Sequence, residues 1–281
     1  MGDFSDDIAS RIVQELLSAL KRGEAEAVYF NFCDCASSVF RGASVAPGFF
    51  SRDHMVKESI HWKLSDIHKQ KLKQMGRVDR YFKALNKSYP GRVQIRGFCE
   101  GNSIEILSTQ LEKVASKTYQ RGLGVSFTNN SEFQSRLALN AAKLRLFAQV
   151  LHIDDEPVAF YLGTKYKSTL FLGHTGYDAR YRKFSPGTIL LQNTINNLDS
   201  DEIHEIDFGF GDASYKRRFC DHSWMESSFY IFGPTFRAIG INLVRTVFLF
   251  VGNLLRFVVR KARAEDVVKR LWRNRLSAES E

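Results

Sequence analysis

The chain has few cysteines, and their spacing is irregular. Its 281 residues include four, at Cys33, Cys35, Cys99 and Cys220. A disulfide-stabilised scaffold needs a denser and more regular framework, so the sequence excludes that class of protein. No second Cys/His pair stands at zinc spacing from the first two cysteines, so we expect no metal site. A nucleophile elbow is also missing, which excludes the hydrolases built around one.

The chain also starts without the features of a secretory signal peptide. Its first seven residues, Met-Gly-Asp-Phe-Ser-Asp-Asp, have neither the basic region nor the apolar region of such a signal. Together with the few cysteines, this predicts a reducing, cytoplasmic setting. A content of 44% hydrophobic and 25% charged residues is ordinary for a soluble globular protein. At this length the chain can form one large domain or two small ones.

Positive charge is concentrated in two segments of the sequence. Residues 57–96 carry eleven Lys/Arg against three Asp/Glu, and residues 237–275 carry ten against two, so each segment has a net charge of +8. The rest of the chain has 19 basic and 26 acidic residues, a net charge of −7. The overall charge of +9 therefore comes from two places and is not a general property of the surface.

Hydrophobic periodicity predicts a mixed α/β fold. Two helices, with Asn102 and Ser131 as their expected N-caps, precede a meander of three strands, and a helix and two further strands follow. The strands are expected at residues 146–153, 157–164, 169–175, 203–208 and 224–232. Earlier in the chain we expect a helix at 6–21, a strand at 28–32, a loop at 34–52, basic helical structure at 63–87 and a strand at 93–97.

The turn at residues 182–187 is the best clue to chemistry. Ser185 is a good helix N-cap, Pro186 suits the first helical position, and Gly187 lets a ligand approach the backbone. A helix N-terminus presents free N–H groups and a partial positive charge. Placed between a strand and a helix, this turn therefore predicts a cradle for a pyrophosphate group.

The residues that follow Asn102 resemble the GNAT acyltransferases. The acyl-CoA loop of that family reads R/Q-x-x-G-x-G/A, with Arg182 first here, Ser185 in place of the first glycine and Gly187 last. The wider run is similar to a bacterial GNAT-like branch associated with cellulose biosynthesis and related in fold to the Fem aminoacyltransferases. The residues that carry this resemblance are Gly176-Tyr177-Asp178, residues 185–191 and 207–211, and Tyr215-Lys216.

The resemblance implies a GNAT acyl-CoA acyltransferase fold in three consecutive parts. These are a partial N-terminal GNAT-like half at residues 1–100, an acyl-CoA-binding domain at 101–235, and a basic amphipathic helical tail at 236–281. It implies no prosthetic group, with acetyl-CoA or another acyl-CoA as co-substrate. The residues expected to bind that co-substrate are Arg182, Lys183, Ser185, Gly187 and Thr188.

Direct acyl transfer needs an oxyanion donor and a group that takes the proton of the acceptor. The resemblance places the donor among the backbone N–H groups of residues 171–175. His174 lies on the same strand and could act as a general base, or it could be a hydrogen-bonded structural residue. Asp207 ends the strand expected beside the thioester. It could take a proton there, or it could cap a turn or pair with Lys216 or Arg217.

Tyr215 and Lys216 come just after a glycine-rich strand end. By the resemblance, Lys216 binds an anionic group of the donor or the acceptor, and Tyr215 protonates the leaving thiolate or packs. A purely structural turn formed by Lys216, Arg217 and Arg218 is the alternative.

The segment at residues 236–263 is long, apolar and interrupted by arginines. At about 100° per residue its polar side chains fall within one narrow stripe of a helix. Three roles are open: packing over the domain, lying in an anionic membrane surface, or spanning a membrane. Arg245 and Arg256 make a span costly, and the cations around Trp272 favour lipid headgroups. A surface role would make the protein peripheral at the inner face of the plasma membrane.

We therefore expect transfer of an acyl group, most simply acetyl, to an amine or hydroxyl of a sugar, a polysaccharide precursor or a lipid-linked acceptor. Two alternatives are a Fem-like transferase that uses aminoacyl-tRNA and a non-catalytic GNAT-like module that docks a membrane synthase complex. The basic residues between Lys63 and Arg96 could bind RNA. A basic helix face is usually just solvated, so we do not expect RNA as a partner.

Overall fold

The chain folds into two compact units. The computed structural model describes residues 5–45, 47–68, 79–98, 104–118, 121, 127–199 and 201–261. Unit 1 comprises Met1–Ile60 and Trp224–Glu281, and unit 2 comprises His61–Ser223. Two long strands, β2 (Lys57–Leu64) and β8 (His222–Phe232), have residues in both units.

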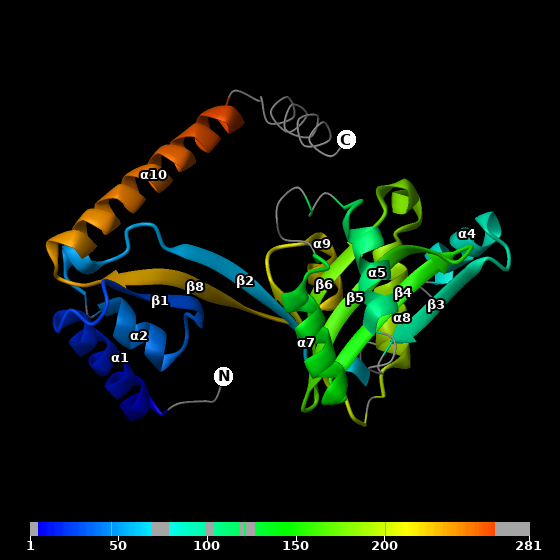
Figure 1. The fold of residues 1–281 in the computed structure, drawn as a ribbon, viewed down its shortest axis with the longest axis horizontal. Coiled ribbons are helices and arrows are strands. Elements are labelled where there is room, and N and C mark those ends of the chain that lie inside the picture. Colours follow the sequence, from blue (N-terminus) through cyan, green and yellow to red (C-terminus); the bar gives the residue numbers. More distant parts are fainter. Residues whose placement is uncertain are drawn as a thin grey trace. The chain divides into compact units, whose positions relative to one another are not determined.

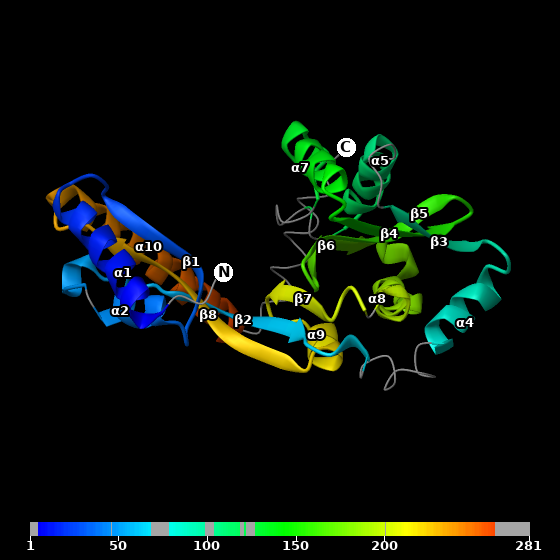
Figure 2. The same ribbon diagram turned by 90° about the horizontal axis from the view of Figure 1, so that it is seen from below.

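Unit 2 is built on a sheet whose strands follow the order β2-β7-β6-β5-β4-β3 (Figure 1 and Figure 2). The neighbours pair antiparallel except β6 and β7, which are parallel. After β2 its elements are α4 (Asp79–Ser88), β3 (Val93–Phe98), α5 (Ile104–Ala115), α7 (Ser131–Ala142), β4 (Leu146–Ile153), β5 (Glu156–Tyr166), β6 (Thr169–Tyr177), η3 (Ala179–Phe184), α8 (Pro186–Asn197), β7 (Glu205–Phe210) and α9 (Ser214–Phe219). The predicted mixed α/β fold, with its three-strand meander followed by a helix, is confirmed.

Strands β6 and β7 pair over a short stretch only. Their pairing joins Thr169–Phe171 to residues 205–207, although β6 continues to Tyr177 and β7 to Phe210. On its other side β6 pairs with β5 along its length, with a register shift between Leu162 and Gly163. A Cβ on Gly163 would lie 2.5 Å from the carbonyl oxygen of Phe171, so the close approach at this irregularity requires glycine.

Helices cover both faces of the unit 2 sheet (Figure 2). Helices α5 and α7 cover one face, and their apolar side chains form a core with β4 and β5. Helix α8 covers the other face, where Ile189, Leu190 and Ile195 pack with Leu151, Ala159 and Ile206 of the strands. The alternation of side chains along each strand supplies both cores, as expected for a sheet that is buried on both faces.

Unit 1 contains strands in the order β1-β8-β2, with helices beside them. Its elements are α1 (Asp6–Lys21), β1 (Ala27–Asp34), α2 (Ser38–Val45), η1 (Phe49–Ser51), the first part of β2, most of β8, and α10 (Phe236–Lys261). Helix α1 is capped by Ser5, whose hydroxyl accepts a hydrogen bond from the N–H of Ile8. Its Val13 and Leu20 pack on Phe229 and Ile231 of β8. The predicted helix at 6–21 and strand at 28–32 are confirmed.

Several local predictions are wrong. The loop predicted at residues 34–52 contains α2 and η1. The basic helix predicted from Lys63 starts later, because β2 runs through Leu64 and pairs with β7; residues 69–78, in the middle of that prediction, lie outside the described residues. Helix α7 is capped by Asn130, whose Oδ1 accepts from the N–H of Phe133 at 2.9 Å, instead of by Ser131. The predicted cap at Asn102 lies outside the described residues as well.

The division into units differs from the three consecutive parts inferred from the sequence. Strand β3 pairs with β4 over Val93–Phe98, so residues 61–100 belong to the same unit as the GNAT-like segment. The first 60 residues form a unit with β8 and α10, because β1 pairs with β8 from Ala27 opposite Phe232 to Asp34 opposite Glu226. Long-range strand pairing of this kind leaves no local sequence signal.

Candidate active site

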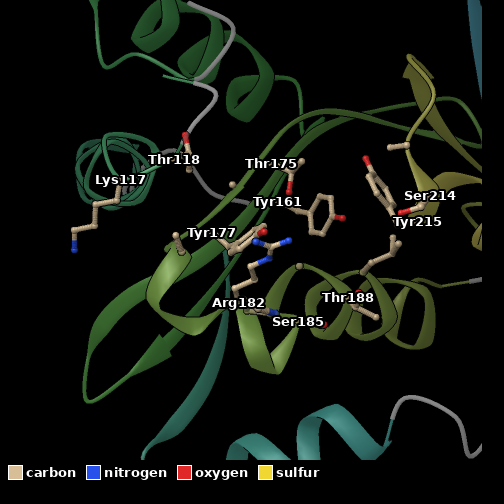
Figure 3. Close-up of a pocket in the computed structure, with 16 residues that line it drawn as sticks. Lys117, Thr118, Tyr161, Thr175, Tyr177, Arg182, Ser185, Thr188, Ser214 and Tyr215 are labelled. Atoms are coloured by element: carbon tan, nitrogen blue, oxygen red, sulfur yellow. The ribbon is translucent and has the colours of Figure 1, made fainter. Parts of the chain in front are cut away.

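Unit 2 holds a cavity of about 500 Å³ at the C-terminal end of β6 (Figure 3). It lies beyond the point where β6 and β7 stop pairing, and the start of α8 and the start of α9 contribute to its wall. Its lining consists of Lys117, Thr118, Tyr161, Thr175, Gly176, Tyr177, Ala179, Arg182, Ser185, Pro186, Gly187, Thr188, Leu191, Ala213, Ser214 and Tyr215. The wall thus has a cationic side at the helix start and a phenolic side at β5 and α9.

Asp178 shapes the turn that leads from β6 to α8. Its buried carboxylate accepts from the backbone N–H of Arg180 at 3.0 Å and pairs with the guanidinium of Arg180 at 2.6 Å and the ammonium of Lys117 at 3.6 Å. Burial acts to raise the pKa of Asp178, but the bonds from Arg180 and the charge of Lys117 outweigh it and lower that pKa. Asp178 therefore organises the loop.

Ser185 does not cap α8 in the predicted way. It occupies the N-cap position, but its backbone is left-handed (φ 51°, ψ 54°) and its side chain makes no capping hydrogen bond. A side-chain cap requires an extended backbone at this position, so the left-handed turn removes it. The carbonyl oxygen of Ser185 accepts instead from the N–H groups of Thr188 at 2.9 Å and Ile189 at 3.2 Å. The left-handed backbone also accounts for the glycine that the GNAT pattern has at this place.

The first turn of α8 is suited to a phosphate group. Pro186 has no N–H, and the N–H of Gly187 has no acceptor within the helix because of its position in the first turn. A Cβ built on Gly187 meets no atom within 4 Å, so the backbone opens directly onto the cavity. Arg182 lines the same end, and Arg218 donates to the hydroxyl of Thr188 at 3.3 Å. Two guanidinium groups at a helix N-terminus form an environment that favours a diphosphate.

Two tyrosines lie side by side on the other wall of the cavity (Figure 3). Tyr161, on β5, is buried, and burial raises the pKa of its phenol; neighbouring Tyr215 raises it further, while a hydrogen bond with Thr175 acts in the opposite direction. Tyr215, at the start of α9, is half-buried, with its ring 6.3 Å from that of Phe208. Because phenols carry a transferable proton at neutral pH, this wall can donate one to an anion in the cavity.

Lys216 lies behind this wall and is not part of the lining. It is buried, and its ammonium donates to the carbonyl oxygens of Gly209 at 3.1 Å and Phe210 at 2.6 Å. Burial lowers the pKa of Lys216. These two hydrogen bonds connect α9 to the end of β7. They therefore also fix the position of the preceding residue, Tyr215, at the cavity. Helix α9 itself was not predicted.

Replacing Lys216 by alanine is expected to destabilise the fold by about 1–3 kcal/mol, because the carbonyl groups of Gly209 and Phe210 lose the donor that the buried ammonium provides. The free energy of unfolding in urea measures this. Arg217→Ala is the matched control, because its guanidinium is exposed and pairs with Asp212 at the surface; it is expected to leave the urea midpoint unchanged. Equal midpoints for Lys216→Ala and the wild type would contradict this role.

Asp207 is paired with a histidine that the sequence did not associate with it. Its carboxylate lies 2.7 Å from Nε2 of His61 on β2, and both side chains are largely buried. Asp207 also accepts from the N–H of Gly209 at 2.7 Å, so it caps the end of β7. The cavity lining contains neither His61 nor Asp207. The catalytic role of Asp207 stays a prediction.

His174 also lies outside the cavity lining. Its ring packs edge-on against Phe133 of α7 with centroids 5.1 Å apart, on the face that α5 and α7 cover. Burial, and after it the charge of Arg136, lowers the pKa of His174. The role of His174 as a base stays a prediction, and its surroundings favour the neutral imidazole.

A second histidine, His152, has a similar environment. It is fully buried, with Nε2 3.2 Å from Oε1 of Gln110, and burial lowers its pKa as well.

Stability is expected to fall as the pH is lowered from about 7 to about 5. The folded chain disfavours protonation of His152 and His174, whereas the unfolded chain accepts these protons near pH 6.5, the ordinary value. The contribution of these two neutral histidines to the free energy of unfolding is therefore present above that pH. It is lost as the pH falls towards their lower pKa in the folded chain. Urea midpoints across this range should decrease, and His152→Gln should flatten the decrease while the exposed-site control His68→Gln should not. A decrease that His152→Gln leaves unchanged would refute this assignment.

The structure brings together five of the nine predicted site residues. Those that line the cavity are Arg182, Ser185, Gly187, Thr188 and Tyr215. Those that do not are Lys183, Asp207, Lys216 and His174. The ammonium of Lys183 lies 4.8 Å over the ring of Phe184 instead. Each predicted residue that lines the cavity thus comes from the turn into α8, the first turn of α8 or the start of α9.

Sequence reasoning missed the residues that β5, β6 and the turn after α5 contribute. These are Lys117, Thr118, Tyr161, Thr175 and Tyr177. The alternation of Thr175 and Tyr177 on one strand was a usable signal, since residues two apart share a face. Tyr161 joins them because it lies opposite Thr175, and the register shift that produces this pairing has no sequence signature.

Comparison with known proteins agrees with this geometry. The sequence matches the family described as "Acetyltransferase (GNAT) domain" over residues 73–217, more than half of its 281 residues. The chain belongs to the GNAT acetyltransferase family. The GNAT match includes the whole cavity lining, from Lys117 to Tyr215. The predicted GNAT fold is confirmed. No curated protein matches the sequence.

Solved structures with the same fold cover most of this GNAT chain. The C-terminal domain of a proposed lysylphosphatidylglycerol synthetase from Agrobacterium fabrum is 12% identical, with a TM-score of 0.54 over 85% of this chain and 77% of its own. L-PGS from Bacillus licheniformis is 12% identical, with a TM-score of 0.55 over 84% and 77%. A conserved protein of unknown function from Bacteroides thetaiotaomicron is 12% identical, with a TM-score of 0.51 over 79% and 75%. At these identities the likeness concerns the fold alone.

Proposed function

We propose that this GNAT protein transfers an acyl group, most simply acetyl, from acyl-CoA to an amine or hydroxyl. The observation that carries the proposal is the open backbone of Gly187 beside Arg182, at one end of a cavity whose other wall holds Tyr161 and Tyr215. In this proposal the pyrophosphate of coenzyme A binds at the end formed by Gly187 and Arg182. The thioester then lies near the phenols of the opposite wall. The proposed setting is the cytoplasm.

In this proposal the chemistry is a direct displacement on the thioester carbonyl. The acceptor nitrogen or oxygen attacks the carbonyl carbon, the C–S bond breaks, and the thiolate takes a proton from the phenol of Tyr215. The acceptor loses one proton to water or to a base. Backbone N–H groups of β6 beyond Phe171, where pairing with β7 has ended, are the candidates for stabilising the developing oxyanion.

The acceptor that we propose is a sugar, a polysaccharide precursor or a lipid-linked molecule. The similarity of residues 185–191 and 207–211 to the branch associated with cellulose biosynthesis supports this class. One fold serves many reactions, so the acceptor class is assigned from this similarity.

Release of free coenzyme A thiol tests the proposed reaction. The purified full chain is incubated with acetyl-CoA and a panel of amino sugars, sugar nucleotides and lipid-linked sugars, and the thiol is measured with a chromogenic reagent. We expect at least one acceptor to raise thiol release above the rate of hydrolysis. Acetyl-CoA binding without transfer to any acceptor would favour a non-catalytic module that docks a membrane synthase complex.

Transfer from aminoacyl-tRNA is the second candidate. It is favoured by the fold likeness to the Agrobacterium fabrum domain, which is described as part of a proposed lysylphosphatidylglycerol synthetase. That name refers to a lipid that carries a lysyl group. The basic segment at residues 57–96 would be the region for RNA in that case. Transfer that requires charged tRNA and continues without any coenzyme A would establish this candidate and exclude the first.

A further inference from the structure

Helix α10 exposes an unusually large apolar surface. It is 26 residues long, and thirteen large apolar side chains between Phe236 and Val258 are exposed. Among them Phe236 is 97% exposed and Phe248 75%. Figure 1 shows the helix leaving unit 1 at its first turns, so that its second half lies clear of the other elements of that unit. Among the described residues it is the one helix long and apolar enough to cross a membrane, over Phe236–Leu255. A surface of this size calls for a partner.

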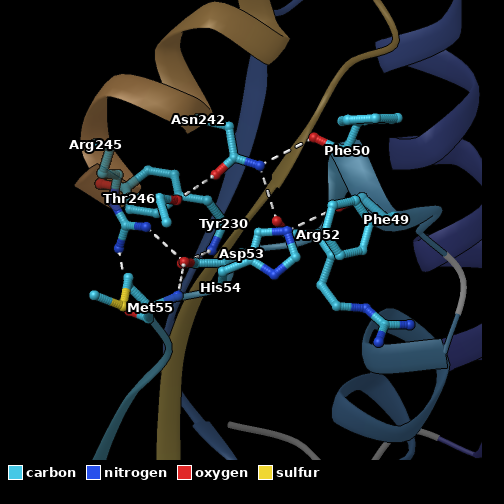
Figure 4. Close-up of polar contacts among 10 residues, drawn as sticks. All are labelled: Phe49, Phe50, Arg52, Asp53, His54, Met55, Tyr230, Asn242, Arg245 and Thr246. Atoms are coloured by element: carbon cyan, nitrogen blue, oxygen red, sulfur yellow. Dashed lines mark hydrogen bonds and ion pairs between the residues drawn. The ribbon is translucent and has the colours of Figure 1, made fainter. Parts of the chain in front are cut away.

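The polar edge of the helix is held by unit 1 (Figure 4). The side-chain amide of buried Asn242 donates to the carbonyl oxygens of Phe50 at 3.0 Å and Arg52 at 2.9 Å. One turn further, the guanidinium of Arg245 lies 2.5 Å from the carboxylate of Asp53. These bonds fix the rotation of the helix about its axis. The apolar faces must therefore point away from the unit.

The anchor of Arg245 is a built site inside unit 1. The carboxylate of Asp53 is buried and also accepts from the N–H groups of Met55 at 2.8 Å and Tyr230 at 3.0 Å. The guanidinium of Arg245 lies 4.7 Å from the centre of the Tyr230 ring. A buried carboxylate with this many donors gives a rigid attachment. The first half of α10 is thus part of unit 1.

This attachment excludes a helix that spans a bilayer. In a span over Phe236–Leu255, Arg245 would lie at the tenth of twenty positions, in the middle of the hydrocarbon. Asp53, Arg52 and the end of η1 would have to lie at the same depth, and irregular backbone is not tolerated there in contact with lipid. A helix that lies along the surface buries its exposed apolar side chains and leaves the Asp53–Arg245 pair with the protein.

Charge favours a lipid surface over a protein partner. Residues 237–275 carry a net charge of +8 in the sequence, so an anionic surface is attracted and a second copy of the same helix is repelled. We propose that α10 lies in the plane of an anionic membrane surface, with its exposed apolar side chains among the lipid chains and Asn242 and Arg245 turned towards unit 1. This attachment is independent of the proposed acyl transfer.

Flotation of the full chain with vesicles tests the proposal. We expect it to float with vesicles of equal parts phosphatidylcholine and phosphatidylglycerol, and to float less with phosphatidylcholine alone or in high salt. The double variant Phe248→Gln with Leu255→Gln keeps the charge and removes two exposed apolar side chains. It is expected to lower the partition coefficient about tenfold or more.

The matched control is Ile106→Gln with Leu139→Gln, which changes two exposed apolar helix residues of unit 2. It is expected to float as the wild type does. No flotation of the wild type, or equal loss in both double variants, would overturn the proposal. So would a stable dimer of the wild type in light scattering that the Phe248/Leu255 variant abolishes. Retention in the membrane after alkaline carbonate extraction would overturn the in-plane orientation, whereas release supports it.

Discussion

Replacing Gly187 by leucine is expected to abolish acyl-CoA binding while the fold stays intact. A Cβ at this position meets no atom within 4 Å, so the new side chain is accommodated only by the cavity. It would fill the space where a phosphate must approach the first N–H groups of α8. We expect the dissociation constant of acetyl-CoA to rise about 100-fold or more, a change that calorimetry resolves. The melting temperature should not fall, because leucine is a better helix former than glycine.

Gly97→Leu is the matched control for this substitution. Gly97 lies on β3, a Cβ there also meets nothing within 4 Å, and it is not part of the cavity lining. The Gly97→Leu variant should bind acetyl-CoA with the same affinity as the wild type. Gly187→Ala adds only the Cβ and should give an intermediate affinity. Unchanged binding in Gly187→Leu would show that the pyrophosphate does not lie on the first turn of α8.

Tyr215→Phe is expected to lower kcat about 100-fold to 1,000-fold with a much smaller change in KM. The phenol lines the cavity opposite the start of α8, where the leaving thiolate of an acyl-CoA would form. Removing only the hydroxyl keeps the ring and its packing with Phe208, so the fold is expected to stay intact. Steady-state kinetics of thiol release measures this effect.

The dependence on the leaving group separates proton donation from packing. If Tyr215 protonates the thiolate, an acyl donor whose thiol is more acidic needs this help less, and the difference between Tyr215→Phe and the wild type should shrink. The control Tyr166→Phe removes an exposed phenol outside the cavity and should have no effect. A Tyr215→Phe enzyme with the wild-type kcat would refute the assigned role and direct attention to Tyr161.

The elements that could be predicted are those that a pattern along the chain encodes. The strands of the meander and helix α8 follow from alternation, turn residues and the Pro186-Gly187 start, and each was located to within a few residues. The pairing of β1 with β8, and of β2 with β7, joins segments far apart in the chain. No periodicity encodes such pairs, so the composition of the two units could not be predicted.

The same limit applies to the site. The turn into α8 and Tyr215 were found because they form a motif along the chain. Tyr161 depends on the register between β5 and β6, and the His61–Asp207 pair depends on β2 lying beside β7. The backbone of Ser185 shows a different limit, because a good N-cap residue adopts a left-handed conformation that the tertiary turn imposes.

Calorimetric titration of the full chain with acetyl-CoA tests whether the cavity between the start of α8 and the two phenols receives the acyl donor. We expect saturable binding at one site in the wild type and in Gly97→Leu, and loss of this binding in Gly187→Leu. Absence of binding to the wild type, or binding that Gly187→Leu leaves unchanged, would contradict this expectation.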